Sequence, residues 1–293
     1  MDKLTFELRC ICKQNRDGSY ATQADRWTQL RLIASQLKRL GYRKLSARSL
    51  RTNHVKALVK NWLHGADHDE MKVSTGTIKN RMAVLRWWAD KVNKQNVVPR
   101  TNKELGIPDR QRLPDENKTF SLSKRQLDAL PRHLHLSVRL QQEFGLRREE
   151  AAKFIPRKAI GENQIQILAS WAKGGRARTI PITTAEQRNL LAEFKQENQN
   201  ASQIPAHLSY REYIAHLTYH FDKVGIKNAH GLRHRYAQQR YIVLTKGRLP
   251  PRMGGKRPSE LTAKEQALGL RARLVVSQEL GHNREEITRV YLG

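Results

Sequence analysis

The first hundred residues carry apolar side chains at three- and four-residue steps, the spacing of one face of an α-helix. Trp27, Leu30 and Ile33 begin one such stripe, and Gly41 is placed to end it. Stripes of this kind usually form a shared core, so we expect an all-helical domain over 1–96. Its predicted helices cover 23–40, 49–63 and 77–93.

The helical spacing disappears over 97–118, where Pro99, Pro108 and Pro114 punctuate a polar stretch. Proline interrupts helices and favours extended backbone. We therefore interpret 97–118 as a linker, followed by a second domain over 119–293.

The second domain combines the helical spacing with the alternating, two-residue spacing of β-strands. Two runs with alternating apolar residues, 163–171 and 176–183, flank Lys173-Gly174-Gly175 and predict a β-hairpin. Helical spacing surrounds this hairpin, and Ser123 is a predicted N-cap. Helices are expected over 124–130, 134–153, 185–196, 210–224, 230–243 and 285–291. A segment rich in proline and glycine, 245–269, is interpreted as a basic insertion. The expected fold class is mainly α with a small β-sheet in the second domain, an α+β fold.

The charge of the chain narrows the choice of partner. Lys and Arg number 55 against 27 Asp and Glu, which gives a net charge of +28. Both parts of the chain share it, with +13 over 1–118 and +15 over 119–293. An enzyme of small metabolites has no use for such a charge, whereas nucleic acid would neutralise it. We expect both domains to touch phosphates as a clamp, and a protein that only coats nucleic acid is the alternative that the charge leaves open.

The location of the protein is predicted from what the sequence lacks. It contains no run of 18 apolar residues, and residues 1–12 hold no apolar stretch typical of a secretion signal. Its two cysteines, Cys10 and Cys12, are too close together to cross-link a fold, and two thiols alone make no zinc site. We expect a protein of the cytoplasm or nucleus with no membrane span.

Two motifs containing arginine could bind a phosphate. His230 and Arg233, three residues apart, lie on one face of a predicted helix, and the guanidinium of Arg233 can bind two oxygens of one phosphate. Arg147 follows Gly145-Leu146 at the start of a helix, where backbone N–H groups favour an anion, and Glu150 can hold its guanidinium. Each motif alone is ordinary, because a chance His-x-x-Arg or a surface Arg–Glu pair would explain it.

Three further residues become informative only in combination. Lys173 lies beside two glycines at the expected hairpin tip, His282 follows Leu280-Gly281, and Tyr291 comes nine residues after His282. Separately they would be an exposed turn lysine, a capping histidine and a packed aromatic side chain.

Taken in order, these motifs resemble those of the tyrosine recombinases, also called phage integrases. The resemblance covers about 120–293, and the N-terminal helices look like the core-binding domain of that family. It implies that Tyr291 attacks a phosphodiester of DNA and forms a 3′-phosphotyrosyl link, leaving a free 5′-hydroxyl. Phosphodiester attack needs an activated phenol and stabilisation of the transition-state charge.

The resemblance also assigns a role to each motif. Arg147 and Arg233 would hold the non-bridging oxygens of the phosphate, and His230 would assist proton transfer at Tyr291. The other roles it implies are proton donation to the leaving 5′ oxygen by Lys173, a hydrogen bond to the phosphate from His282, and support of an arginine by Glu150. No metal and no other cofactor is implied.

The implied biology is integration or excision of a mobile genetic element by a site-specific recombinase. Its partners would be double-stranded DNA, three further copies in a homotetramer on synapsed sites, and an accessory DNA-bending or directionality protein. The expected location is the cytoplasm, on the nucleoid of a prokaryotic host. Expected DNA contacts in the first domain are Lys79, Arg81 and Arg86.

Two alternatives remain open. A type IB topoisomerase shares this set of residues, and a recombinase-derived DNA-binding protein could lack catalysis.

The sequence departs from the family pattern in three ways. It has the 245–269 insertion, and only two residues follow Tyr291 where family members commonly carry a further tail, which leaves the contacts between protomers open. It also shows no obvious N-terminal arm-binding module of the kind that some phage integrases carry.

Overall fold

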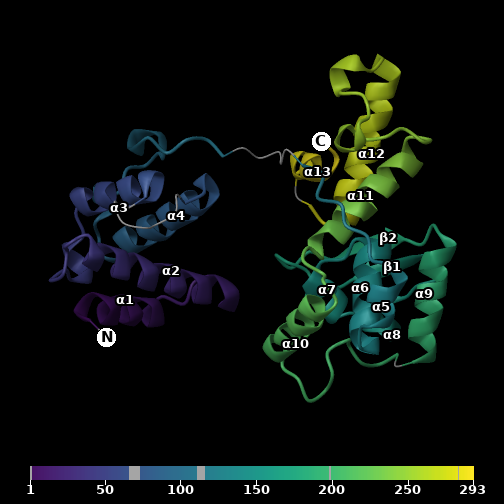
Figure 1. The fold of residues 1–293 in the computed structure, drawn as a ribbon, viewed down its shortest axis with the longest axis horizontal. Coiled ribbons are helices and arrows are strands. Elements are labelled where there is room, and N and C mark those ends of the chain that lie inside the picture. The colour runs from purple at the N-terminus through teal and green to yellow at the C-terminus, as the bar shows by residue number, and fades with distance from the viewer. Residues whose placement is uncertain (1, 66–72, 111–115, 198, 283) are drawn as a thin grey trace. The chain divides into compact units, whose positions relative to one another are not determined.

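The chain folds into two compact units, residues 1–111 and 112–293 (Figure 1). A computed structural model describes residues 2–65, 73–110, 116–197, 199–282 and 284–293. The described part is mainly helical with one small two-stranded sheet, which confirms the expected fold class. None of the described helices is both long and apolar enough to cross a membrane.

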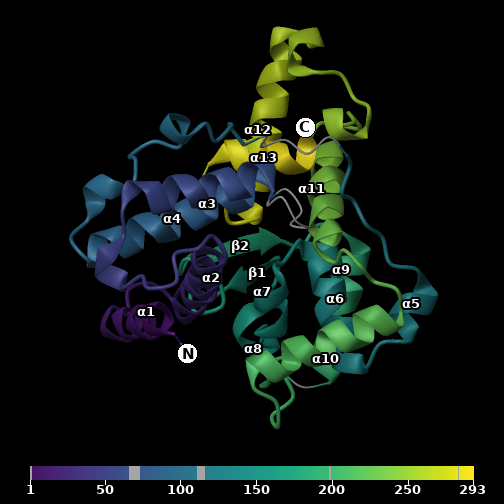
Figure 2. The ribbon, with the colours of Figure 1, turned by 60° about the vertical axis from the view of Figure 1, so that its left-hand side comes forward.

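The N-terminal unit packs four helices around one apolar core (Figure 2). The helices are α1 (Lys3–Gln14), α2 (Tyr20–Arg39), α3 (Thr52–His64) and α4 (Thr75–Lys91), joined by the short 3₁₀ turns η1 (Ala47–Ser49), η2 (Gln95–Val97) and η3 (Lys103–Leu105). Trp62 and Trp88 are fully buried, and their indole N–H groups donate to Gln36 and to the Ala47 carbonyl, each at 2.9 Å. The expected helices are present, but α1 was missed because its short apolar pattern is interrupted by the exposed Phe6.

The segment expected to be a linker begins as part of this unit. Val98 and Ile107 are buried in the N-terminal core, and the guanidinium of Arg86 donates to the Pro99 carbonyl at 3.1 Å and to Asn102 at 2.8 Å. Residues 111–115 of the segment lie outside the described residues. The proline-rich stretch is thus packed as far as Ile107, because its apolar residues find the helical core.

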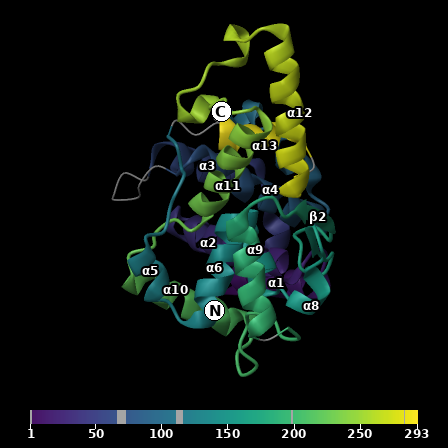
Figure 3. The same cartoon turned by 90° about the vertical axis from the view of Figure 1, so that its right-hand side faces the viewer.

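The C-terminal unit surrounds its small sheet with helices (Figures 1 and 3). Strands β1 (Gln164–Ile167) and β2 (Arg178–Pro181) pair antiparallel, with Ile165 opposite Ile180. The predicted hairpin is present, but its strands are shorter than the expected runs over 163–171 and 176–183. Ser123 caps its helix as expected. The helices are α5 (Lys124–Asp128), α6 (Arg132–Phe144), α7 (Arg148–Ala152), α8 (Pro156–Ala159), α9 (Ala185–Gln196), α10 (Tyr210–Lys223), α11 (His230–Leu244), α12 (Ala263–Glu279) and α13 (Glu285–Leu292).

The sequence pattern was wrong about two stretches of this unit. The helix expected over 134–153 is broken at Gly145, so that α6 and α7 are separate. Residues 263–269 of the segment interpreted as an insertion, 245–269, are the first turns of α12, a helix that the pattern did not predict. Helix α12 has no one-sided apolar stripe, since Leu270 and Leu274 are each 45% exposed. The rest of the segment contains the turns η4 (Pro251–Met253) and η5 (Pro258–Glu260).

Gly145 is required by both backbone geometry and space. Its φ of +61° is a left-handed conformation that L side chains rarely adopt. A Cβ atom there would lie 2.4 Å from Cδ1 of Tyr236, a buried ring whose hydroxyl donates to Glu279 at 2.8 Å. The chain can therefore turn between α6 and α7 only with glycine.

We expect Gly145→Ala to destabilise the C-terminal unit by about 2–4 kcal/mol, from left-handed strain and overpacking together. Gly225→Ala is the matched control, because Gly225 also follows a helix at positive φ but has no neighbour within 4 Å of an added Cβ. That control should cost only about 1 kcal/mol. Hydrogen exchange of α11 peptides across a urea series measures both values. Equal losses in the two variants would show that the contact with Tyr236 carries no energy.

Candidate active site

Tyr291 lies at the centre of a cluster of histidine and arginine side chains. It belongs to α13 and is 6% exposed. Its hydroxyl oxygen is 3.4 Å from Nε of Arg233 and 3.4 Å from Nε2 of His230. His230 and Arg233 come from the first turn of α11, where their spacing places them on one face as predicted.

The guanidinium of Arg233 joins three segments. It is 1% exposed, and it donates to the carbonyl oxygens of Gly145 and Leu280 and, at 3.2 Å, to Nε2 of His282. Burial lowers the pKa of Arg233 to about 10, so the group still carries its charge at neutral pH. Its hydrogen-bond partners among the described residues are uncharged acceptors, so this buried cation has no carboxylate of its own.

Arg147 approaches the same place from the turn between α6 and α7. It is the N-cap of α7, and its backbone N–H donates to Glu150 at 2.7 Å. Its guanidinium donates to Glu150 at 2.8 Å and to the Gly281 carbonyl at 3.1 Å. The Arg147 side chain is 25% exposed, so it can still reach a ligand.

Glu150 is fully buried and serves two arginines. Besides Arg147 it binds Arg178, whose two terminal nitrogens donate to its oxygens at 2.9 and 2.7 Å. Burial alone would raise the pKa of Glu150, but the hydrogen bonds and positive charges of Arg178 and Arg147 outweigh it and lower the pKa to about 2. Sequence reasoning missed Arg178, because nothing in a strand pattern tells which side chain meets a helix twenty-eight residues away.

The geometry assigns the tautomer of His282. Its Nε2 accepts from Arg233, so the ring proton is on Nδ1, which donates to the buried Thr288 hydroxyl at 3.0 Å. Burial, followed by the charges of Arg233 and Arg147, lowers the pKa of His282 to about 3. His282 is therefore a neutral imidazole held in one orientation.

His234 completes the setting of Tyr291 and was not among the expected site residues. It is 3% exposed, and its ring centroid lies 4.3 Å from that of Tyr291. Burial lowers its pKa to about 4, with a further contribution from the charge of His230. Its position one helical turn after His230 was the available signal, because residues four apart share a face.

Lys173 is the one expected catalytic residue that the structure does not bring to the cluster. It is exposed in the turn that joins β1 and β2, and it makes no hydrogen bond or ion pair with the described residues. The other expected residues, with the supporting Glu150, lie together.

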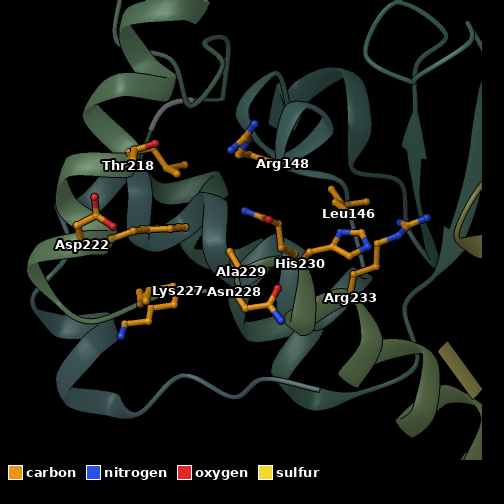
Figure 4. Close-up of a pocket in the computed structure, with 13 residues that line it drawn as sticks. Leu146, Arg148, Thr218, Asp222, Lys227, Asn228, Ala229, His230 and Arg233 are labelled. Carbon is orange, nitrogen blue, oxygen red and sulfur yellow. The ribbon is translucent and has the colours of Figure 1, made fainter. Parts of the chain in front are cut away.

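A pocket of about 500 Å³ opens beside the cluster. His230 and Arg233 line one end of it, and Thr218 and Asp222 of α10 line the opposite side (Figure 4). Burial and the nearby charge of Arg233 lower the pKa of His230, so its imidazole is neutral at neutral pH and can accept a proton.

The residues expected to touch DNA in the N-terminal unit each have an intramolecular contact. Lys79 pairs with Asp109 at 3.1 Å, and the guanidinium of Arg81 lies 5.3 Å from the Trp62 ring centre. Arg86 binds the 97–118 segment as described above. DNA binding by these three residues stays a prediction.

Two protein-family models match the sequence. "Phage integrase, N-terminal" matches residues 1–98, and "Integrase" matches residues 109–239. The chain belongs to the integrase family of tyrosine recombinases. It is accordingly an enzyme, a site-specific recombinase of the tyrosine type. No curated protein sequence gives a significant match.

Solved integrase and recombinase structures share the fold at low sequence identity. XerH site-specific recombinase bound to palindromic difH substrate has a TM-score of 0.59 at 17% identity, over 99% of this chain and 81% of that one. A lambda integrase dimer bound to a COC′ core site has a TM-score of 0.59 at 13% sequence identity, over 98% of this chain and 77% of that one. The Tn1549 transposon integrase with circular intermediate DNA has a TM-score of 0.56 at 12% sequence identity, over 100% of this chain and 96% of that one. These likenesses confirm the expected tyrosine-recombinase fold.

The lowered histidine pKa values predict acid sensitivity of the integrase fold. A histidine whose pKa is depressed by folding stabilises the protein above the unfolded pKa, and that stability is lost as the pH falls toward the folded value. For His234, with a folded pKa of about 4, lowering the pH from 7.5 to 5 should cost about 2 kcal/mol. Glu150 stays ionised over this range, because its folded pKa of about 2 is lower still.

His234→Phe should therefore make the free energy of unfolding less dependent on pH by about that amount, as measured by urea unfolding at the two pH values. His207→Phe, at an exposed position, is the control and should leave the pH dependence of the free energy of unfolding unchanged. An identical pH dependence in wild type and His234→Phe would contradict the burial of an uncharged His234.

Proposed function

We propose that the chain cleaves and rejoins double-stranded DNA through a covalent 3′-phosphotyrosyl link to Tyr291. The observation that carries this proposal is the approach of Arg233 and His230 to the Tyr291 hydroxyl, each at 3.4 Å. A nucleophile, a proton acceptor and a phosphate-binding guanidinium thus meet at one oxygen atom.

In the cleavage step the Tyr291 hydroxyl gives its proton to Nε2 of His230. The phenolic oxygen then forms a bond to phosphorus, and the bond from phosphorus to the 5′ oxygen breaks. The leaving oxygen takes a proton from Lys173 and departs as a 5′-hydroxyl. Rejoining reverses these transfers with another 5′-hydroxyl and needs no energy source, because the phosphotyrosyl link conserves the energy of the phosphodiester.

The arginines stabilise the extra negative charge of the transition state. Arg233 is fixed by carbonyl oxygens and Arg147 by Glu150, so neither must reorganise when the charge develops. Neutral His282 accepts from Arg233 through Nε2 and donates its one ring proton to Thr288, so in this arrangement it orients Arg233 and has no N–H group left for the hydrogen bond to the phosphate that the family resemblance implied. Lys173 is exposed, and we propose that its hairpin turn brings it to the 5′ oxygen when DNA binds.

The biological setting is proposed on the same basis. The high positive charge supports contact of both units with duplex DNA. We propose a homotetramer on two synapsed sites, with an accessory DNA-bending or directionality protein, that integrates or excises a mobile element in the cytoplasm of a prokaryotic host. Mixing the protein with DNA from the flanks of its own gene should yield recombinant junctions. Relaxation of supercoiled DNA without junctions would favour topoisomerase activity instead.

Tyr291→Phe should keep the fold and DNA binding but form no covalent protein–DNA adduct, because only the attacking oxygen is removed. Duplexes nicked near the cleavage position, with sequences taken from the recombinant junctions, would trap the adduct on a denaturing gel. Tyr241→Phe is the matched control, a buried tyrosine of α11, and should form the adduct as wild type does. An adduct formed by Tyr291→Phe would assign the nucleophile to another residue.

A further inference from the structure

Arg178 joins three elements around the site without touching Tyr291. It opens strand β2, and its side chain is 7% exposed. Its terminal nitrogens donate to the two oxygens of Glu150 at 2.9 and 2.7 Å, and its Nε donates to the Glu279 carbonyl at 2.7 Å. The base of the Lys173 hairpin is thereby attached to α7 and to the end of α12.

The turn that carries His282 also packs on Arg178. Gly281 has a φ of +64°, and a Cβ atom there would lie 3.1 Å from Cδ and from Nη1 of Arg178. The same glycine supplies the carbonyl that Arg147 binds. Arg178 thus contacts the structures that hold Arg147 and His282 in place.

The charge balance gives Arg178 a second effect. Among the described residues, Glu150 is the one carboxylate that Arg147 and Arg178 share. Its oxygens accept from Arg147 at 2.8 Å and from Arg178 at 2.9 and 2.7 Å. Without Arg178, the negative charge of Glu150 would compensate Arg147 alone. With Arg178 present, the three side chains of Arg147, Glu150 and Arg178 together keep a net positive charge. Arg147 is the most exposed of the three, so it is the one that can present this charge to a ligand.

We infer that Arg178 is a positioning residue of the recombination reaction: it neutralises Glu150 so that Arg147 keeps its positive charge for the scissile phosphate, an inference that rests on the function proposed above. Because this effect of Arg178 is electrostatic, it can be separated by experiment from the attachment of the hairpin to α7 and α12. In a variant that lacks the negative charge of Glu150, the positive charge of Arg178 should no longer be needed.

The test is single-turnover cleavage of the nicked junction duplex by the full chain. Arg178→Gln should slow cleavage about 30-fold while the Kd for DNA changes by no more than about threefold. Adding Glu150→Gln to Arg178→Gln should restore the rate to within about tenfold of wild type, since Arg147 regains an uncompensated charge. Arg176→Gln removes the same charge from an exposed position of the same hairpin and should cleave as wild type does.

Arg178→Lys loses the bidentate geometry but keeps the positive charge beside Glu150, on one ammonium nitrogen with three N–H groups. Because the proposed effect depends on the charge, this variant should cleave within about fivefold of wild type, and it is the test variant if Arg178→Gln does not fold. The inference is overturned if Arg178→Gln cleaves like Arg176→Gln, or if the double variant is no faster than Arg178→Gln. It is also overturned if a folded Arg178→Lys is inactive. A wild-type chain that forms no adduct would overturn the proposed function itself.

Discussion

The guanidinium groups of three arginines, Arg147, Arg178 and Arg233, are held in the C-terminal unit. Among the described residues, Glu150 is the one carboxylate that bonds to any of them, and it bonds to the first two. An arginine cannot shed its proton at neutral pH, so each needs acceptors that the fold must supply. The backbone supplies them, through the carbonyls of Gly145 and Leu280 for Arg233 and of Gly281 for Arg147. Carbonyl dipoles satisfy the donors but leave the positive charge uncompensated, which is the condition for binding an anion.

This constraint explains the turns on either side of the site. The α6–α7 turn must aim its carbonyl at Arg233, and it does so at a glycine with positive φ packed against Tyr236. The turn between α12 and α13 must offer two carbonyls, and it too contains a positive-φ glycine, Gly281. Helix α13 follows directly, so the position of Tyr291 depends on the same contacts.

Local sequence patterns predicted the parts of the site that depend on helical spacing. Their three-residue spacing predicted that His230 and Arg233 lie together on one face of a helix. In the same way, Glu150 lies one turn after Arg147, which predicted its contact with the Arg147 guanidinium. Arg178 escaped prediction, because its partners come from two other elements and only the packed fold brings them to β2. Helix α12 escaped for a different reason: its apolar residues lie on several faces, so no one-sided stripe marks it.

The central claim is that uncompensated arginine charge serves the charge of the scissile phosphate. A junction duplex with a neutral methylphosphonate at the scissile position tests this most directly, with Arg147→Ala as the variant because Arg147 is the partly exposed arginine. The account predicts that Arg147→Ala fails to cleave the ordinary phosphodiester but forms the Tyr291 adduct with the methylphosphonate. A folded, DNA-binding Arg147→Ala that stays inactive on both substrates, while wild type cleaves the ordinary one, would contradict it.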